Sequence, residues 1–171
     1  VDGLFIGGGF PECFIEALAV NKTMRSEIKM FIESGGPAYA ECGGLMYLSC
    51  SISWRDQSGP MVGVIPAHTK VLDRPVGRGY MQLRIRSDHP WPASRENARS
   101  LIPAHEFHHS SLEPVDADWP TAFTVERGHG LDGSRDGIHI YNLLAGYAHQ
   151  RHVQANPWVD AFVDFVHEHR K

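Results

Sequence analysis

The segment Pro37–Leu48 constrains the fold of this chain more than any other stretch. It reads Pro-Ala-Tyr-Ala-Glu-Cys-Gly-Gly-Leu-Met-Tyr-Leu. Pro37–Ala40 suits a short buried strand, and the apolar residues that follow the glycines begin a helix. Gly43 and Gly44 permit a sharp reversal between the two, because neither residue carries side-chain bulk. The pattern predicts a nucleophile elbow with Cys42 at its corner.

Two interpretations of Cys42 are open. At a helix N-terminus, which favours negative charge, its thiolate would be an activated nucleophile with free backbone N–H groups beside it. Alternatively, Cys42 is a small buried residue in a tight turn, which is the commoner situation of a lone free cysteine. The order of strand, cysteine, two glycines and apolar helix favours the nucleophile.

Composition excludes several classes of protein. The 171 residues are 42% hydrophobic and 21% charged, which is typical of one globular domain with a real core. The net charge is −4, and the basic residues are scattered, so we expect no nucleic-acid partner. Three cysteines do not make a disulfide framework and favour a reducing cytoplasm. We find no secretory signal and no apolar run long enough to cross a bilayer, so no membrane partner is expected.

The first third of the chain follows an α/β pattern. Val1–Ile6 reads as a buried parallel strand that runs into the loop Gly7–Gly9, and helices are expected at about Pro11–Val20 and Lys22–Ser34. The pattern predicts an open, mostly parallel sheet flanked by helices. Ligands of such sheets bind at the carboxyl ends of the strands, so the glycine loop should lie beside Cys42 and offer backbone donors to an oxyanion. A flexible turn is the alternative for the three glycines.

The remainder reads as strands, loops and a terminal helix. The expected strands are Met61–Ile65, Thr69–Leu72, Gly79–Ile85, Thr121–Glu126 and one or two within Gly137–Ala148. The expected loops are Ser51–Pro60, Asp88–Ser100 and Gly128–Gly137, and the expected helix is Pro157–His169.

Histidines mark two further candidate positions. His105, His108 and His109 lie close together, but their spacing is not that of a zinc helix and no cysteine pair is near. A strand that lines a cleft is favoured over a metal site, and no metal is assigned. His149 follows an expected strand, where a second catalytic group could meet Cys42, although a single histidine is more often structural.

Several blocks of residues, in one order, resemble a known family. The blocks are Gly7-Gly8-Gly9-Phe10-Pro11-Glu12, Ala40-Glu41-Cys42-Gly43-Gly44-Leu45-Met46-Tyr47-Leu48, Gly79-Tyr80, His105-Glu106-Phe107-His108 with Ser110, and Tyr147-x-His149. Together they resemble the glutamine amidotransferase domain of the cobyrinic acid a,c-diamide synthases. The resemblance covers nearly the whole chain and implies a class I glutamine amidotransferase-like, flavodoxin-like fold.

The resemblance also implies a chemistry. In that family the cysteine attacks the side-chain amide of glutamine, which gives a glutamyl thioester and ammonia. An ATP-dependent ligase domain then uses the ammonia to amidate the a and c carboxylates of a corrin precursor. Carried over by position, Cys42 is the nucleophile and His149 is the general base. The substrate glutamine would be bound by Gly8, Gly9, Gly43, Tyr80, Glu106 and His108, with the backbone of Gly8 and Gly43 as the oxyanion hole.

Three departures from the family pattern matter. Many class I amidotransferases carry a glutamate two residues after the catalytic histidine, where this chain has Arg151, and the sequence names no other partner for His149. His149-x-x-His152 also replaces the His-x-His that is usual in this branch. The first strand–helix unit of the domain is missing, and so is the phosphate-binding motif of a ligase domain.

These departures lead to expectations about the whole protein. We expect residues 1–171 to be an N-terminally incomplete amidotransferase domain, with ATP and Mg²⁺ bound in an absent ligase domain that also receives the tetrapyrrole acceptor. An exposed sheet edge would be covered by a partner or by a second copy of the chain in a homodimer. A catalytically silent assembly module and a different cysteine hydrolase are the alternatives.

Overall fold

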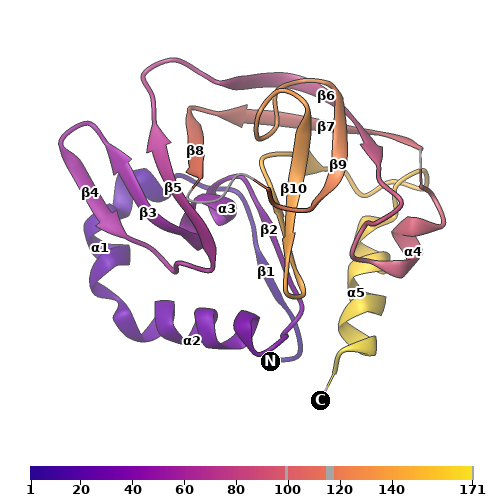
Figure 1. Cartoon of the computed structure of the whole chain (residues 1–171), viewed down its shortest axis with the longest axis horizontal. Coiled ribbons are helices and arrows are strands. Elements are labelled where there is room, and N and C mark those ends of the chain that lie inside the picture. Colours follow the sequence, from indigo (N-terminus) through magenta and orange to yellow (C-terminus); the bar gives the residue numbers. More distant parts are fainter. Residues whose placement is uncertain (99, 115–117, 171) are drawn as a thin grey trace.

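The computed structural model describes residues 1–98, 100–114 and 118–170 (Figure 1). Its helices are η1 (Pro11–Phe14), α1 (Ile15–Val20), α2 (Lys22–Glu33), α3 (Gly43–Leu48), α4 (Pro92–Arg95) and α5 (Trp158–Glu168). Its first six strands are β1 (Leu4–Ile6), β2 (Ala38–Glu41), β3 (Ser49–Trp54), β4 (Gln57–Pro60), β5 (Ile65–Val71) and β6 (Gly77–Ile85). The later strands are β7 (Leu101–His108), β8 (Ser110–Pro114), β9 (Thr121–Arg127), β10 (Arg135–Ile140), β11 (Leu143–Gly146) and β12 (His149–Gln150).

The larger sheet has the strand order β1-β2-β11-β10-β9-β6-β7-β12. β2 pairs in parallel with β1 and β11, and the other pairings described in this sheet are antiparallel. The predicted α/β fold class is confirmed, and its parallel part carries the elbow. Parallel pairing does not extend to the later strands. β10 and β11, for example, are joined by only Tyr141 and Asn142, a link that antiparallel strands allow and parallel strands do not.

The smaller sheet has the order β4-β3-β5-β8 and was not expected as a separate unit. The prediction of a loop over Ser51–Pro60 is wrong, because β3 and β4 form a hairpin there. Serines hide its polar–apolar alternation, in which Ile52 is fully buried. The two short strands predicted at Met61–Ile65 and Thr69–Leu72 are one strand, β5. Met61 and Val62 are buried but lie before this strand and outside any other.

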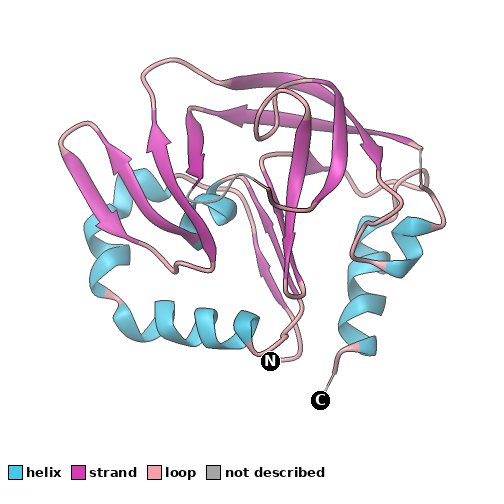
Figure 2. Ribbon diagram, in the orientation of Figure 1, coloured by secondary structure: helices cyan, strands magenta, loops and turns pink. Residues whose placement is uncertain are grey.

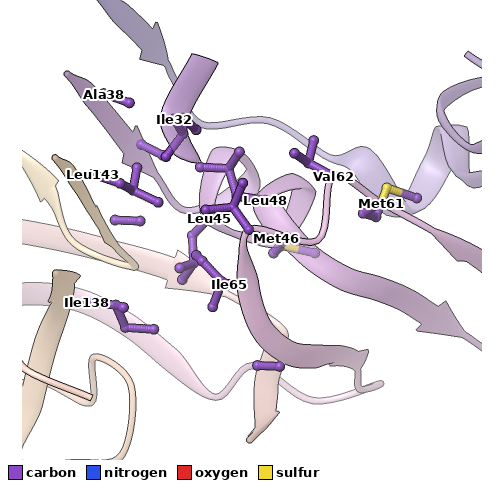
Figure 3. Close-up of a cluster of buried hydrophobic side chains, with 14 of the residues drawn as sticks. Ile32, Ala38, Leu45, Met46, Leu48, Met61, Val62, Ile65, Ile138 and Leu143 are labelled. Atoms are coloured by element: carbon purple, nitrogen blue, oxygen red, sulfur yellow. The ribbon is translucent and has the colours of Figure 1, made fainter. Parts of the chain in front are cut away.

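Hydrophobic cores lie on both faces of the parallel strands. Figure 2 shows α1, α2 and the smaller sheet on one side of these strands, and α4 and α5 on the other. Ala38 and Ala40 of β2 belong to the first core, and Tyr39 between them belongs to the second, as the alternation of side chains along a strand requires. The first core (Figure 3) also holds Ile32 of α2, Leu45 and Leu48 of α3, Ile65 of β5, and Ile138 and Leu143 of the larger sheet.

The predicted helices are present, with small differences at their ends. Asn21 ends α1 and caps α2, where its side chain accepts a hydrogen bond from the backbone N–H of Met24 at 3.2 Å. The first expected helix opens as the 3₁₀ helix η1, and the terminal helix is α5. The segment expected to be irregular over residues 88–100 contains the single turn α4, next to the buried Trp91, and Arg99 lies outside the described residues.

Candidate functional site

Cys42 occupies a strained corner between β2 and α3. Its φ is 47° and its ψ −104°, a conformation that is uncommon for a residue with a side chain. Two backbone hydrogen bonds hold it: the Cys42 N–H donates to the carbonyl of Gly146 at 2.8 Å, and its carbonyl accepts from the N–H of Met46 at 3.0 Å. Such strain persists where the surroundings fix it, and it gathers at functional sites. The predicted strand–cysteine–helix corner is therefore present.

The glycine loop lies directly against this corner. A Cβ added to Gly43 would stand 2.7 Å from the backbone nitrogen of Gly9, and a Cβ added to Gly44 would run into the carbonyl of Ile6. Neither backbone can shift easily, so both elbow positions require glycine. This close approach brings Gly8 and Gly9 to the carboxyl end of β1, beside Cys42, as the sequence predicted.

His149 enters the same place from the other edge of the larger sheet. β12 pairs antiparallel with β7, which sets His149 opposite His105. The two imidazole rings stack, with 4.7 Å between their centres and 9° between their planes. On the loop side, a Cβ added to Gly8 would lie 2.5 Å from Cε1 of His149. The His149 ring thus meets the glycine loop at its Cε1 edge and His105 on one face.

Cys42 and His149 interact directly, although 107 positions separate them in the sequence. The pKa of His149 is raised to about 10, first by a hydrogen bond with Cys42 and then by one with Glu41, against the opposing effect of burial. The Oε2 atom of Glu41 lies 3.6 Å from Nδ1 of His149. The imidazole therefore carries a proton at neutral pH, beside the sulfur of Cys42.

A pocket opens at the sulfur. The Sγ atom of Cys42 is 3.7 Å from the carbonyl oxygen of Phe107. Phe10 and Phe107 are about half exposed or more, and both line the pocket. The pocket is lined by Gly9, Phe10, Glu12, Cys42, Met46, Val71, Phe107, His108, His109 and Ser110. Its position lets a small ligand reach the sulfur and the glycine loop at once.

The other residues predicted to bind substrate differ in whether they line this pocket. His108 lines the pocket, stacks on Tyr147 with 3.8 Å between ring centres, and has Nδ1 2.9 Å from the carbonyl of Ser110. Glu106 is buried behind it and accepts hydrogen bonds from the N–H groups of His129 and Gly130 at 2.7 and 2.9 Å. Glu106 thus stabilises the turn between β9 and β10, and it does not line the pocket.

Tyr80 lies outside the pocket. It is 81% exposed, on β6, and its register partner on β7 is His105. Tyr80 therefore lies beside His105 in the sheet and is not among the residues that line the pocket.

Glu41 and Asp136 were not predicted from the sequence as residues of the site. Both oxygens of the fully buried Asp136 carboxylate accept N–H bonds, from Tyr147 at 3.0 Å and Ala148 at 2.9 Å, so Asp136 fixes the chain that leads to His149. Burial raises the pKa of Asp136 to about 6. Glu41 could have been found from the two-residue period of β2, which sets it on the same face as Tyr39. No pattern in the sequence indicates the role of Asp136.

In residues 1–98, 100–114 and 118–170, no three or more His, Cys, Asp or Glu side chains come together as a metal site. Over the same ranges, no helix has both the length and the apolar character to span a bilayer.

Comparison with known protein families gives a match over most of the chain. The profile of the CobB/CobQ-like glutamine amidotransferase domain matches residues 1–157. A cobyrinate a,c-diamide synthase of Magnetococcus marinus is 40% identical over 169 residues, which cover 98% of this chain and 35% of that protein. The corresponding enzyme of Archaeoglobus fulgidus is 46% identical over 150 residues, which cover 87% of this chain and 31% of that protein. The chain thus spans about a third of the length of these relatives.

Solved structures agree on the fold. PurLQS from Thermotoga maritima superposes with a TM-score of 0.67 at 14% identity, covering 96% of this chain and 80% of that one. A glutamine amidotransferase superposes with a TM-score of 0.62 at 15% identity, covering 98% of this chain and 78% of that one. The class I amidotransferase-like fold predicted from the sequence is confirmed.

Proposed function

Because this chain belongs to the family of CobB/CobQ-like glutamine amidotransferase domains, we propose that it is the glutamine-hydrolysing part of an amide ligase. The contact between the sulfur of Cys42 and the imidazole of His149 supports this function most directly. A nucleophile that lines the pocket would then have a proton carrier in contact with it and the glycine loop beside it.

The reaction begins when the Cys42 thiolate attacks the side-chain amide carbon of glutamine. The carbonyl oxygen gains the negative charge, which the backbone N–H groups of Gly8 and Gly43 would stabilise. The C–N bond then breaks, His149 gives its proton to the leaving nitrogen, and ammonia departs from a glutamyl thioester. His149, now neutral, takes a proton from water, which attacks the thioester and releases glutamate.

The ammonia would serve a ligase part that lies outside these 171 residues. The relatives named cobyrinate a,c-diamide synthase support an acceptor of that type, with the a and c carboxylates of cobyrinic acid or a related tetrapyrrole as the groups amidated. ATP and Mg²⁺ would bind in that ligase part, since carboxylate activation needs a phosphoryl donor. Three free thiols fit a reducing compartment such as the cytoplasm.

A glutamine analogue with an electrophilic carbon tests the proposal. With 6-diazo-5-oxo-L-norleucine, the folded chain is expected to gain one adduct, located by peptide mass spectrometry on Cys42 and absent from Cys13 and Cys50. Cys13 is exposed and Cys50 partly exposed, so they control for simple accessibility. The Cys42→Ala variant should gain none.

Two outcomes would overturn this function. A folded chain that gains no adduct would be a catalytically silent amidotransferase-like module, one that binds or assembles through its sheet edge. Equal labelling of all three cysteines would show that Cys42 has no special reactivity toward glutamine analogues.

A further inference from the structure

The carboxylate of Glu41 faces the ring of His149 from the strand that ends at the nucleophile. Its Oε2 atom lies 3.6 Å from Nδ1, and the side chains of Glu41 and His149 are only 9% and 22% exposed. Nδ1 faces this carboxylate, so Nε2 is the ring nitrogen left for the sulfur of Cys42. The geometry makes a line of three groups: carboxylate, imidazole and sulfur.

We propose that Glu41 is the positioning residue of His149, whose carboxylate fixes the ring through Nδ1 and stabilises its protonated form. This inference rests on the proposed glutaminase function and adds the third member of its catalytic set. It assigns this role to the residue directly before the nucleophile. Many class I amidotransferases carry a glutamate two residues after this histidine, and this chain has Arg151 at that position.

The second oxygen of Glu41 is held by groups that direct the first. Oε1 accepts hydrogen bonds from the phenol of Tyr39 at 2.6 Å and from the backbone N–H of Gln150 at 3.0 Å. The amide of Gln150 also donates to the phenol oxygen of Tyr39 at 2.9 Å. With Oε1 occupied, Oε2 is the oxygen that remains for His149.

The residues of this arrangement come in pairs that are close together in the sequence. Tyr39 and Glu41 are two residues apart on β2 and share a face, and Gln150 directly follows His149 on β12. Tyr39 is 2% exposed and packs edge-on against Trp91, with 5.2 Å between ring centres, so its hydroxyl cannot swing away. Burial and then the charge of Glu41 raise the pKa of Tyr39 well above its ordinary value, so the phenol stays a donor.

Charge gives a second reason for the pairing. A buried carboxylate is costly unless it is paired and hydrogen-bonded. In the part of the chain that the structure describes, Glu41 forms its ion pair with His149. Among the residues that the structure describes, the titratable groups that face His149 are Cys42 at the elbow, Glu41 on β2 and His105 on β7, whose ring is stacked on it. His105 opposes the protonated form, and Glu41 and Cys42 favour it.

The test compares Glu41→Gln with the unsubstituted chain. Glutamine keeps the shape and one acceptor oxygen for Tyr39 and Gln150, but removes the charge. We expect the pKa of His149, followed by NMR of ¹⁵N-histidine-labelled protein, to fall toward the ordinary histidine range. We also expect the rate at which 6-diazo-5-oxo-L-norleucine labels Cys42 to fall about 10²-fold, the usual loss when a proton-transfer group is misplaced.

A surface variant controls for the loss of a carboxylate. Glu126→Gln removes a carboxylate that pairs with Arg84 at 2.6 Å on the exposed face of β9, and both measurements should stay at the unsubstituted values. An unchanged His149 pKa in Glu41→Gln, with unchanged labelling, would overturn the proposal.

A second variant, Glu41→Asp, tests the proposal even if Glu41→Gln does not fold. Glu41→Asp keeps the charge and shortens its reach by one methylene, so labelling of Cys42 should be slower than in the unsubstituted chain. Labelling at the unsubstituted rate would overturn the proposal. If the unsubstituted chain takes up no analogue at all, the glutaminase function fails, while the NMR titration still decides whether Glu41 and His149 are coupled.

Discussion

At the scale of single residues, the position of one imidazole ring organises the site. The ring of His149 meets a glycine at its Cε1 edge, a stacked histidine on one face, a carboxylate at Nδ1 and the sulfur of Cys42. Each contact comes from a different element, so the ring has little freedom to turn. A proton carrier fixed in this way needs no reorganisation when the amide bond breaks.

A Gly8→Ala variant tests how accurately the imidazole of His149 must be positioned. A Cβ at Gly8 would stand 2.5 Å from Cε1 of His149, so Gly8→Ala should push the imidazole away from Cys42. We expect labelling of Cys42 by the glutamine analogue to slow about 10²-fold, as for a displacement of about 1 Å. The rate of adduct formation measures this.

Gly7→Ala is the matched control for that variant. A Cβ at Gly7 would meet the ring of Phe5 at an ordinary 3.7 Å, so this variant should react at nearly the unsubstituted rate. A Gly8→Ala protein that reacts as fast as Gly7→Ala would show that the loop does not set the position of His149.

Part of this site could be predicted from the sequence. The elbow at Cys42 and the glycine loop follow from local rules, because glycines and a short apolar strand determine the backbone there. The role of His149 came from a resemblance, and Glu41 was overlooked, since a carboxylate beside a nucleophile gains its meaning only when a distant strand brings the imidazole to it. Glu106 and Tyr80 were expected in the cleft. The structure sets Glu106 behind the pocket and Tyr80 outside it.

At the scale of elements, the second core stabilises the face of β2 that carries Tyr39 and Glu41. α4 and α5 pack over this face, and the buried His89 lies between Trp91 and Phe123, with 5.2 Å to the centre of each ring. Its Nδ1 accepts the backbone N–H of Trp91 at 3.1 Å, which requires the neutral ring.

His89 therefore makes stability depend on pH. Burial, and then repulsion from His139, lowers its pKa to about 3. The unfolded value is about 6.5, so the stability that this residue contributes is fully present above about pH 6.5 and is lost as the pH falls toward 3. His89→Phe should flatten this acid dependence, measured as the free energy of unfolding in urea at pH 7 and pH 5.

A surface histidine provides the comparison. His167 is exposed on α5, so His167→Gln should keep the full acid dependence. If His89→Phe and His167→Gln lose stability equally between pH 7 and pH 5, the buried imidazole is not the source of the dependence.

Elements were predictable where their pattern is local. The amphipathic helices α2 and α5 and the strands β6, β7 and β9 follow from periodicity. The hairpin of β3 and β4 was missed because its serines and Gly59-Pro60 resemble a loop, while the pairing that makes it a sheet comes from β5 and β8. The direction of the later strands was missed for the same reason, since pairing partners are not written in any one segment.

At the scale of the whole molecule, the site forms where three parts of the chain meet. The loop after β1 and the corner after β2 lie at the carboxyl ends of the parallel strands, and β7 with β12, from the opposite edge of the sheet, brings His149 to the same place. Figure 1 shows β1, β2 and β7 in this arrangement. The positions of Cys42 and His149 thus depend on the strand pairings that run across the larger sheet, and a loss of those pairings should lower the reactivity of Cys42.

The most direct measurement of the central claim is the release of glutamate and ammonia from glutamine by the 171-residue chain and by its Cys42→Ala variant. The account predicts that the unsubstituted chain releases the two products in equal amounts and that the variant releases neither above the uncatalysed rate. Equal release by the two proteins would contradict it.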